Sequence, residues 1–320
     1  MWKTIFRRVL LMLPQILILS ILVFAVARLM PGDPFTGLIT PETDPSTIEA
    51  LRERAGLNEP IIVQYFNWLK NAFQGDFGMS YTYKVPVSTL IGGRAVNTIF
   101  LSLLTLIFTY LIALPLGILS GRYNNSSFDK GVVLYNFISY AIPTFVLALL
   151  MVWLFGYELQ WFPTNGSVST GLSAGTPAYY WDRFYHMLLP AITYALLGTT
   201  GIIQYLRSEV IDAKQQDYVK TARSKGVPEN VVYNRHIFRN SLLPVASTFG
   251  YEITGLIGGS VFIEQIFAYP GMGQLFIQSI NSRDYSVITA LVLIFGISTI
   301  LGTLLSDIIM TIVDPRIRID

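Results

Sequence analysis

The sequence predicts an all-α integral membrane protein that crosses the bilayer with six transmembrane helices. The chain of 320 residues is 52% hydrophobic, has a mean hydropathy of +0.51 and carries only 13% charged residues, about half the share found in soluble domains. Its apolar residues stand in uncharged runs of about 20 residues or more, the length that an α-helix needs to cross a bilayer. Because a soluble core could not hide this much apolar surface, we expect a multi-span helical bundle.

The first span follows a short basic tip. Lys3, Arg7 and Arg8 precede Val9–Ala27, which is uncharged for 19 residues. Residues 1–30 are therefore predicted to form a cytoplasmic tip and the first transmembrane helix. Residues 25–27 (AVA) also resemble a signal-peptidase site, so a cleaved signal peptide is the alternative, although the apolar run is long for one.

Residues 31–94 form the longest polar interval. It opens with PGDPF at 31–35, whose prolines and glycine end the preceding helix. Two short amphipathic helices are expected within it, over 45–56 and about 60–73. They are too short to span, so we predict an extracytoplasmic insertion whose helices lie on the membrane surface or cover the outer end of the bundle. Direct contact with a substrate is the alternative.

Residues 95–313 are predicted to form one transmembrane domain with the five remaining spans. Uncharged or nearly uncharged runs cover 95–121, 131–157, 187–206, 242–263 and 285–306, and the last continues to about 313. Pro115, Pro143 and Pro190 lie in or beside these runs, where a kink is tolerated if neighbours satisfy the freed carbonyl. The outward loop 158–186 is rich in aromatic residues that suit the headgroup region.

The charges indicate how the chain is oriented. Six spans place both termini on one side, together with a basic segment at 207–241 and a tail at 314–320. That side holds 14 Lys and Arg residues, whereas the short loops opposite hold two, Arg183 and Arg283. Both termini and the basic segment are therefore expected to be cytoplasmic in a multi-pass protein of the plasma membrane. A net charge of only +2 gives no reason to expect a nucleic-acid partner.

Several kinds of active site are missing from the sequence. The patterns GxxxxGK[ST] and HExxH do not occur, and the chain contains no cysteine. The two histidines, His186 and His236, are expected on opposite sides of the membrane. We therefore predict a chain that is not an enzyme and that holds neither a cofactor nor a metal.

The expected fifth span, 242–263, is unusually polar. Glu252 stands within it, and Gly255 and Gly259 have the GxxxG spacing that lets another helix approach closely. An acid at this depth is expected to face a polar cavity or a partner. The residues predicted to line a translocation pathway are Glu252, Gly255, Gly258, Gly259 and Ser260. The alternatives are that the glycines only pack helices and that Glu252 is paired or protonated near the end of the span.

The basic segment resembles the coupling loop of the permeases of ATP-binding-cassette (ABC) importers. KTARSKG at 220–226 is similar to their EAA motif, with Thr221 and Ala222 in the two alanine places, Gly226 as the glycine and Lys220 in place of the glutamate. The longer pattern DYVxTARxKG…RHxxRNxLLP, typical of the peptide/nickel branch, is complete from Asp217 to Pro244.

Stretches outside the basic segment agree with this resemblance. GGSVFIEQIFAYPGMGQL at 258–275, followed by RDY at 283–285, is similar to a further motif of that branch. PGDP at 31–34 and the stretch 57–81 resemble the B-type transmembrane subunit of oligopeptide and dipeptide permeases. The outer-loop motif residues are then Glu264, Phe267, Pro270 and Gly271.

The resemblance implies a type I ABC importer fold and half of a pathway for oligopeptide uptake. The implied partners are a second, C-type permease subunit, two cytoplasmic ABC ATPases that hold ATP and Mg, and an extracytoplasmic peptide-binding protein that the insertion helps to dock. The residues expected to contact an ATPase are Tyr218, Lys220, Thr221, Ala222, Arg223, Lys225, Gly226, Pro228, Arg235, His236 and Arg239.

The resemblance also implies an anatomy for this coupling segment. A first helix is expected over 217–225, a turn at Gly226, and a second helix with Pro228 as its first residue. Five apolar residues would seat in a groove of the ATPase: Val219, Ala222, Val227, Val231 and Val232. Without the resemblance, a basic loop at an anionic lipid surface would explain the same charges.

Other functions remain alternatives. The substrate could be a dipeptide, nickel or another small solute of the same branch. A secondary transporter working alone would need coupling-ion groups in several spans and usually internal repeats. Glu252 and Asp307 are the clear intramembrane acids, and the sequence has no evident repeat.

Overall fold

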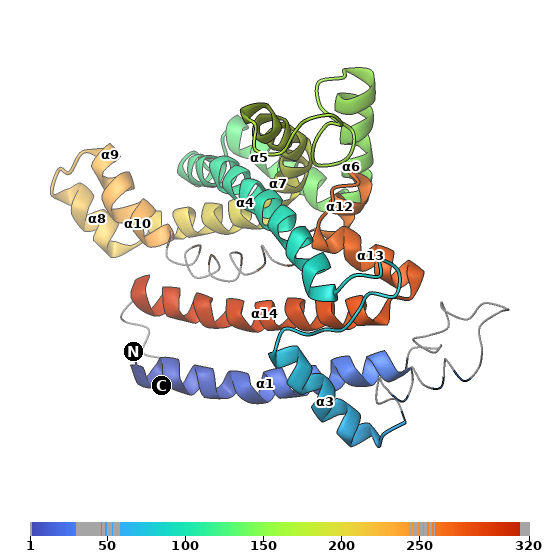
Figure 1. Ribbon diagram of the computed structural model, residues 1–320. Coiled ribbons are helices and arrows are strands. Elements are labelled where there is room, and N and C mark those ends of the chain that lie inside the picture. Colours follow the sequence, from blue (N-terminus) through green and yellow to red (C-terminus); the bar gives the residue numbers. More distant parts are fainter. Residues whose placement is uncertain are drawn as a thin grey trace.

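The computed structural model describes most of the chain and is almost entirely helical in that part (Figure 1). The described residues are 2–29, 46, 49, 53, 58–242, 245, 249, 252, 255, 258 and 260–313. Several predictions lie wholly or mostly outside them: the turn at 31–35, the helix at 45–56, much of the span at 242–263 with Gly259, and the tail at 314–320.

Four helices in the described part are long and apolar enough to cross a membrane. They are α1 (Trp2–Leu29), α4 (Val87–Arg122), α7 (Pro177–Lys214) and α14 (Tyr285–Val313). Each contains one of the apolar runs, because a helix satisfies every backbone N–H and C=O of a segment in lipid. Four of the six expected spans are thus present as single helices.

The expected third span is not one kinked helix but two helices bent by 102°. α5 (Ser127–Ala141) ends before Ile142-Pro143, and α6 (Thr144–Met151) then continues as the π-helix η2 (Val152–Glu158). Proline has no N–H and disfavours helical backbone at the residue before it, and Ile142 is indeed extended, with φ −82° and ψ 121°. Counted as one span, the bent pair raises the number in the described residues to five.

α4 and α7 form a closely packed parallel pair along the middle of the molecule (Figure 1). A Cβ atom on Gly121 would lie 2.6 Å from Val210 Cβ, and one on Gly117 would lie 3.1 Å from Leu206 Cβ. Small residues allow two helix backbones to approach in this way where lipid gives no hydrophobic drive for association. The pair is therefore closest toward its C-terminal ends.

α1 and α14 form a second pair, which is antiparallel. A Cβ atom on Gly296 would lie 2.5 Å from Leu19 Cδ2, and Arg8 Nη1 lies 2.8 Å from Asp307 Oδ2. The start of α1 and the end of α14 therefore lie together (Figure 1).

One of the two amphipathic helices predicted in the insertion is described. α3 (Ile61–Phe73) crosses α1, where the Tyr65 hydroxyl lies 2.8 Å from Ser20 Oγ and the rings of Tyr65 and Phe24 are 5.5 Å apart. Ile62, Phe66 and Phe73 remain exposed. The helix thus contacts α1 through Tyr65 and Trp68, whose ring lies 5.8 Å from that of Phe24, and most of its other large apolar side chains stay exposed.

The remaining helices gather at opposite ends of α4 and α7 (Figure 1). At the C-terminal end of α7 lie α8 (Asp217–Ser224), α9 (Glu229–Val231), the π-helix η3 (Val232–Ile237) and α10 (Phe238–Ser241). Near the start of α4 lie α12 (Val261–Ile266) and α13 (Met272–Ser282). The predicted coupling segment and the predicted outer-loop motif are therefore at opposite ends of the bundle.

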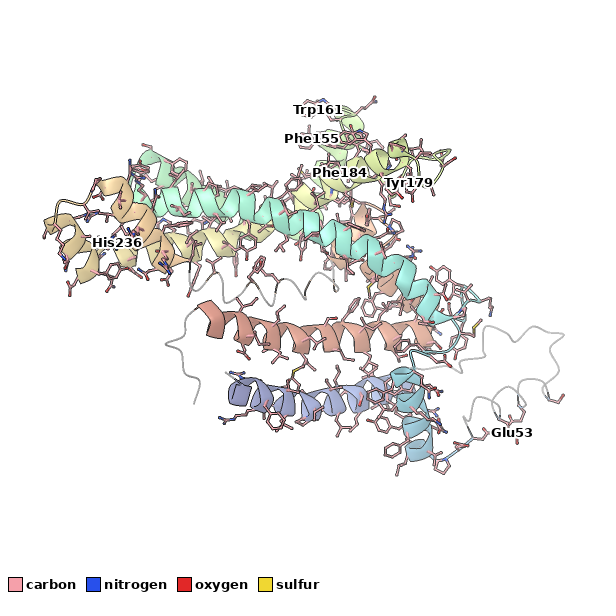
Figure 2. The ribbon with its side chains drawn as sticks, turned by 60° about the vertical axis from the view of Figure 1, so that its left-hand side comes forward. Glu53, Phe155, Trp161, Tyr179, Phe184 and His236 are labelled. Atoms are coloured by element: carbon pink, nitrogen blue, oxygen red, sulfur yellow. The ribbon has the colours of Figure 1, made fainter. Side chains whose placement is uncertain are left out.

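Aromatic side chains mark the end that carries the loop 158–186. Figure 2 shows Phe155, Trp161, Tyr179 and Phe184 together there, with His236 at the far end. The rings of Phe155 and Trp161 are 5.7 Å apart, and Trp161 is exposed. This distribution suits the headgroup region on that side of a bilayer.

Candidate functional site

The coupling segment turns at Gly226, as the sequence predicts. Gly226 has φ +73°, in the left-handed region, and a Cβ atom there would meet nothing within 4 Å. Its N–H donates to the Arg223 carbonyl at 2.9 Å, which closes the C-terminal end of α8. Glycine is required here by backbone conformation rather than by lack of space.

The second half of the segment differs from the prediction. Pro228 is not the first helical residue but the residue before it, with φ −55° and ψ 138°. The backbone then turns into α9, which has three residues, and continues through η3 and α10. The extended ψ of Pro228 places it outside the helix, where its missing N–H costs nothing.

The apolar residues of the segment pack inward rather than facing a partner. Val219, Ala222 and Val232 are buried and Val227 is partly buried in a core shared with α7, whereas Val231 is exposed. The expectation that all five would seat in an ATPase groove is therefore wrong. The buried residues pack instead against Leu206, Val210 and Ala213 of α7.

The outer face of the segment is polar and basic. Of the residues expected to contact an ATPase, nine are exposed: Tyr218, Lys220, Thr221, Arg223, Lys225, Gly226, Pro228, Arg235 and Arg239. His236 is half-buried and Ala222 is buried. Two ion pairs hold the outer face: Lys220 Nζ lies 2.9 Å from Asp217 Oδ1, and Arg223 Nη2 lies 2.6 Å from Glu229 Oε1. The Arg223 guanidinium holds the pKa of the Glu229 carboxyl below its ordinary value. The surface offered to a partner therefore remains charged at neutral pH.

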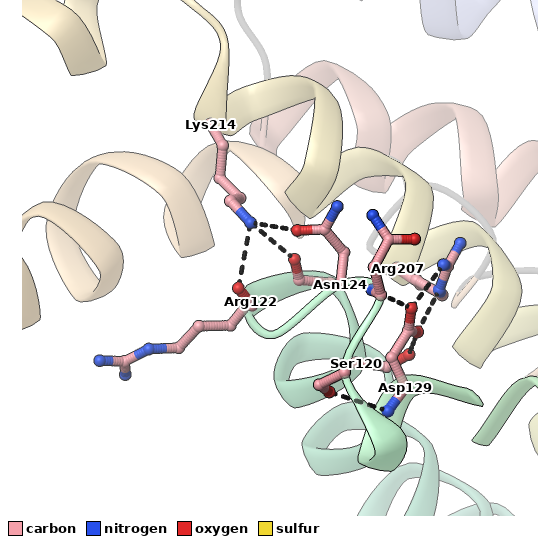
Figure 3. Close-up of polar contacts among 9 residues, drawn as sticks. Ser120, Arg122, Asn124, Asp129, Arg207 and Lys214 are labelled. Carbon is pink, nitrogen blue, oxygen red and sulfur yellow. Dashed lines mark hydrogen bonds and ion pairs between the residues drawn. The ribbon is translucent and has the colours of Figure 1, made fainter. Parts of the chain in front are cut away.

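A polar cluster at the ends of α4, α5 and α7 lies beside the segment (Figure 3). Asp129 is buried, and Arg207 donates to both of its oxygens, from Nε at 2.6 Å and from Nη2 at 2.8 Å. Lys214 Nζ donates to the carbonyls of Gly121 and Arg122 and to Asn124. A cation at these last carbonyls of α4 complements the helix dipole.

The sequence prediction missed this cluster, although a signal was present. The pattern Ser126-x-x-Asp129 is a helix-start signature, and Ser126 Oγ does accept from the Asp129 N–H at 3.2 Å. That signature predicts the start of α5. It does not predict that Arg207, 78 residues later, binds the same carboxylate.

At the opposite end, Glu264 organises the outer-loop motif. Its carboxylate is fully buried; Oε1 accepts from Thr98 Oγ1 at 2.7 Å, and Oε2 accepts from the N–H groups of Gly273 and Gln274 at 2.6 and 3.1 Å. These N–H groups belong to the first turn of α13, which has no intrahelical partner for them. Glu264 thus caps α13 and connects it to α4.

The other motif residues build the same corner. Phe267 is buried in an apolar core that also contains Leu189, and the Pro270 carbonyl accepts from Asn97 Nδ2 at 2.7 Å. Gly271 packs directly on the Glu264 carboxyl, where a side chain has no room. The motif therefore folds the chain between α12 and α13 into a rigid corner against α4.

The described residues of the predicted pathway do not contact one another as the outer-loop motif residues do. Glu252 is half-buried, and its Oε2 accepts from the Tyr110 hydroxyl of α4 at 2.7 Å. A Cβ atom on Gly255 or Gly258 would meet nothing within 4 Å, so neither glycine makes a close helix contact within the described residues. Ser260 accepts from the Ile263 N–H as the cap of α12. The described residues contain no cluster of acids and histidines able to hold a metal.

Comparison with known proteins identifies the family of this chain. Residues 113–319 match the family of inner membrane components of binding-protein-dependent transport systems, and residues 1–102 match its N-terminal region. The chain belongs to this family. It is a multi-pass permease subunit of a bacterial ABC importer, and it is not catalytic, because ATP hydrolysis takes place in separate ATPase subunits.

Individual relatives match along nearly the whole chain. The oligopeptide transport system permease protein AppB of Bacillus subtilis (strain 168) is 43% identical over 315 residues, 98% of each chain. The glutathione transport system permease protein GsiC of Escherichia coli (strain K12) is 32% identical over 318 residues, 99% of each chain. The inward-facing MetNI methionine ABC transporter has a chain of the same fold, with a TM-score of 0.55 at 15% identity over 70% of this chain and 96% of that one.

Proposed function

We propose that this permease subunit forms half of a pathway for oligopeptide uptake. The observation that carries the proposal is its similarity over 98% of its length to an oligopeptide permease. The resemblance of residues 57–81 to B-type subunits supports the same choice. A second, C-type permease subunit would supply the other half of the pathway, since the spans of one chain are few for a path as wide as a peptide.

The coupling segment would receive motion from two cytoplasmic ATPases. Its exposed basic face, with Tyr218, Lys220, Lys225 and Arg235, would meet acidic rims on an ATPase. ATP binding would draw the two ATPases together and move the coupling segments, turning the pathway outward. ATP and Mg would be held by those partners. The alternative, a basic loop on anionic lipid, requires the same charges but no Gly226 turn.

The orientation follows from the coupling role. The start of α1 and the end of α14 lie together, and basic residues concentrate in the tip, the coupling segment and the tail. We place all three in the cytoplasm. Residues 31–94 would then be an extracytoplasmic insertion that helps to dock a peptide-binding protein, and 95–313 the transmembrane domain.

Within the pathway, Glu252 is the residue most suited to meet a substrate. It is half-buried and shares a hydrogen bond with Tyr110 on α4. A carboxylate in this position would favour cationic groups on a passing peptide. Gly255 and Gly258 would leave the wall beside it without side chains.

Uptake by the reconstituted assembly tests the proposal. The tagged chain is purified in mild detergent with its partners, placed in proteoliposomes with its binding protein and ATP, and offered labelled pentapeptides, dipeptides or Ni²⁺. ATP-dependent accumulation of the pentapeptide is the expected result. Accumulation of only the dipeptide or only Ni²⁺ would show that the oligopeptide is not the substrate. Purification as a solitary chain that transports without ATP would favour a secondary transporter.

A further inference from the structure

We propose that Asp129 is a positioning residue that joins the coupling segment to α4 and α5, so that these elements move as one body. The inference rests on the proposed function, because the coupling segment must receive a motion before it can pass one on. It assigns a role to a residue outside the coupling segment, in the first turn of α5.

The carboxylate of Asp129 is contacted from several elements at once. Asp129 is 2% exposed and lies in the first turn of α5. It accepts from Ser120 Oγ at the end of α4, from the Asn125 N–H of the intervening turn at 2.7 Å, and from Arg207 of α7. Arginine bound to both oxygens fixes direction as well as distance. Three helices are therefore held at one point.

The second step is a further attachment near the end of α7. Lys214 follows Arg207 by about two helical turns, and it donates to the carbonyls of Gly121 and Arg122 at 3.2 and 3.0 Å. Between the two cations, Val210 packs directly on Gly121. Figure 3 shows the polar contacts of this joint. Together with the contact between Val210 and Gly121, they attach the last two turns of α7 to α4.

The third step connects this joint to the coupling segment. Only Gln215 and Gln216 separate α7 from α8. Arg122, the last residue of α4, lies 4.5 Å from the ring centre of Tyr233 in η3 and donates to Asn230 at 3.1 Å. The buried valines of α8 and η3 pack on α7. Because the connection is short and these contacts are close, a displacement of α8 is transmitted to α7, and through α7 to α4 and α5.

The fourth step separates Asp129 from the other ion pairs nearby. Lys220–Asp217 lies within α8 and Arg223–Glu229 joins α8 to α9, both at the exposed surface of the segment. Exposed pairs contribute little. Loss of the Asp129 carboxylate, by contrast, leaves Arg207 facing a buried site without its partner.

A distance measurement tests whether the elements move together. The chain has no cysteine, so Lys130→Cys on α5 and Asn234→Cys on η3, both exposed, take spin labels selectively in an assembly whose partners are freed of cysteine. The same narrow distance distribution is expected without nucleotide and with ATP. In the Asp129→Asn background the distribution should broaden or shift between the two states. The double exchange Asp129→Arg with Arg207→Asp should narrow it again.

Transport gives a second readout. Peptide imported per ATP hydrolysed should fall at least about fivefold in Asp129→Asn, the lower range of coupling between sites. Asp212→Asn, which removes an exposed acid from the same end of α7, should keep the wild-type ratio. A wild-type distance that changes between the two states, or an Asp129→Asn ratio equal to wild type, overturns the proposal. If the Asp129→Asn variant does not assemble, the test rests on the wild-type distance, which must be the same without nucleotide and with ATP. Absence of ATPases from the assembly would instead refute the proposed function.

Discussion

Gly271 packs on the carboxyl group of Glu264 so closely that no side chain fits between them. Glu264 caps the first turn of α13 from a distance of several residues, through the N–H groups of Gly273 and Gln274. Gly271, the residue at the N-cap position, has no side chain with which to do so. The glutamate and the glycine of the outer-loop motif are therefore one structural device, since the carboxylate occupies the space that the glycine leaves.

Replacement of Gly271 by alanine is expected to destabilise this corner. The new Cβ pushes the Glu264 carboxylate away from buried N–H groups, at a cost on the order of 3 kcal/mol in the free energy of unfolding. Thermal unfolding in detergent measures it. Gly131→Ala in α5 is the matched control, because a Cβ there meets nothing within 4 Å and alanine favours a helix. Equal unfolding temperatures for the two variants would contradict this explanation.

Replacement of Gly226 is expected to act through backbone conformation. Gly226→Val must hold a β-branched residue in the left-handed region, which costs about 1–2 kcal/mol or more. Uptake should be lost while membrane insertion is retained. Gly226→Asn, which tolerates this region better, should keep most of the uptake. Normal uptake by the valine variant would refute a coupling role for this turn.

The Glu252→Gln variant tests the pathway. Tyr110 can still donate to the amide oxygen, so the expected change is in selectivity: uptake of peptides rich in lysine should fall relative to uptake of acidic ones. Uptake and ATP turnover are compared for peptides that differ only in charge. Wild-type values for every peptide would remove Glu252 from the pathway.

The Asp307→Asn variant separates an importer from a secondary transporter. Asp307 forms an ion pair with Arg8 that joins α14 to α1, so the expected loss is a modest one in stability, about 1 kcal/mol or less for a partly exposed pair. Uptake by the variant should depend on ATP as it does in the wild type, and it should not depend on the proton gradient. An effect of the variant on proton-coupled uptake would support the alternative class.

The sequence predicted individual elements better than their contacts. The four single-helix spans follow from apolar length, which is a local property. The turn at Gly226 was implied by the family resemblance, and glycine suits it because it tolerates left-handed backbone. The bend at Pro143 was visible as a possible kink, but its 102° angle depends on what surrounds the two helices. The apolar residues of the coupling segment were expected to face a partner, but apolar character indicates burial without saying what covers it.

The same limit applies to Asp129 and Glu264. Each lies far along the chain from a residue that binds it, Arg207 in the first case and Thr98 in the second. Each could be found in the sequence as an acid near a helix start. Its partner could not be found, because the contact depends on how distant helices pack.

Cross-linking at α8 tests the central claim, that the exposed face of this helix meets an ATPase. Single cysteines are placed in the cysteine-free chain at Tyr218, which is exposed, at Val219, which is buried, and at Tyr180, which is exposed at the opposite end. The purified assembly is then treated with a short bifunctional thiol reagent. A cross-link to an ATPase at position 218, absent at 219 and 180, is the predicted result. A cross-link to an ATPase at position 180 but not at 218 would contradict the claim and reverse the orientation of the chain.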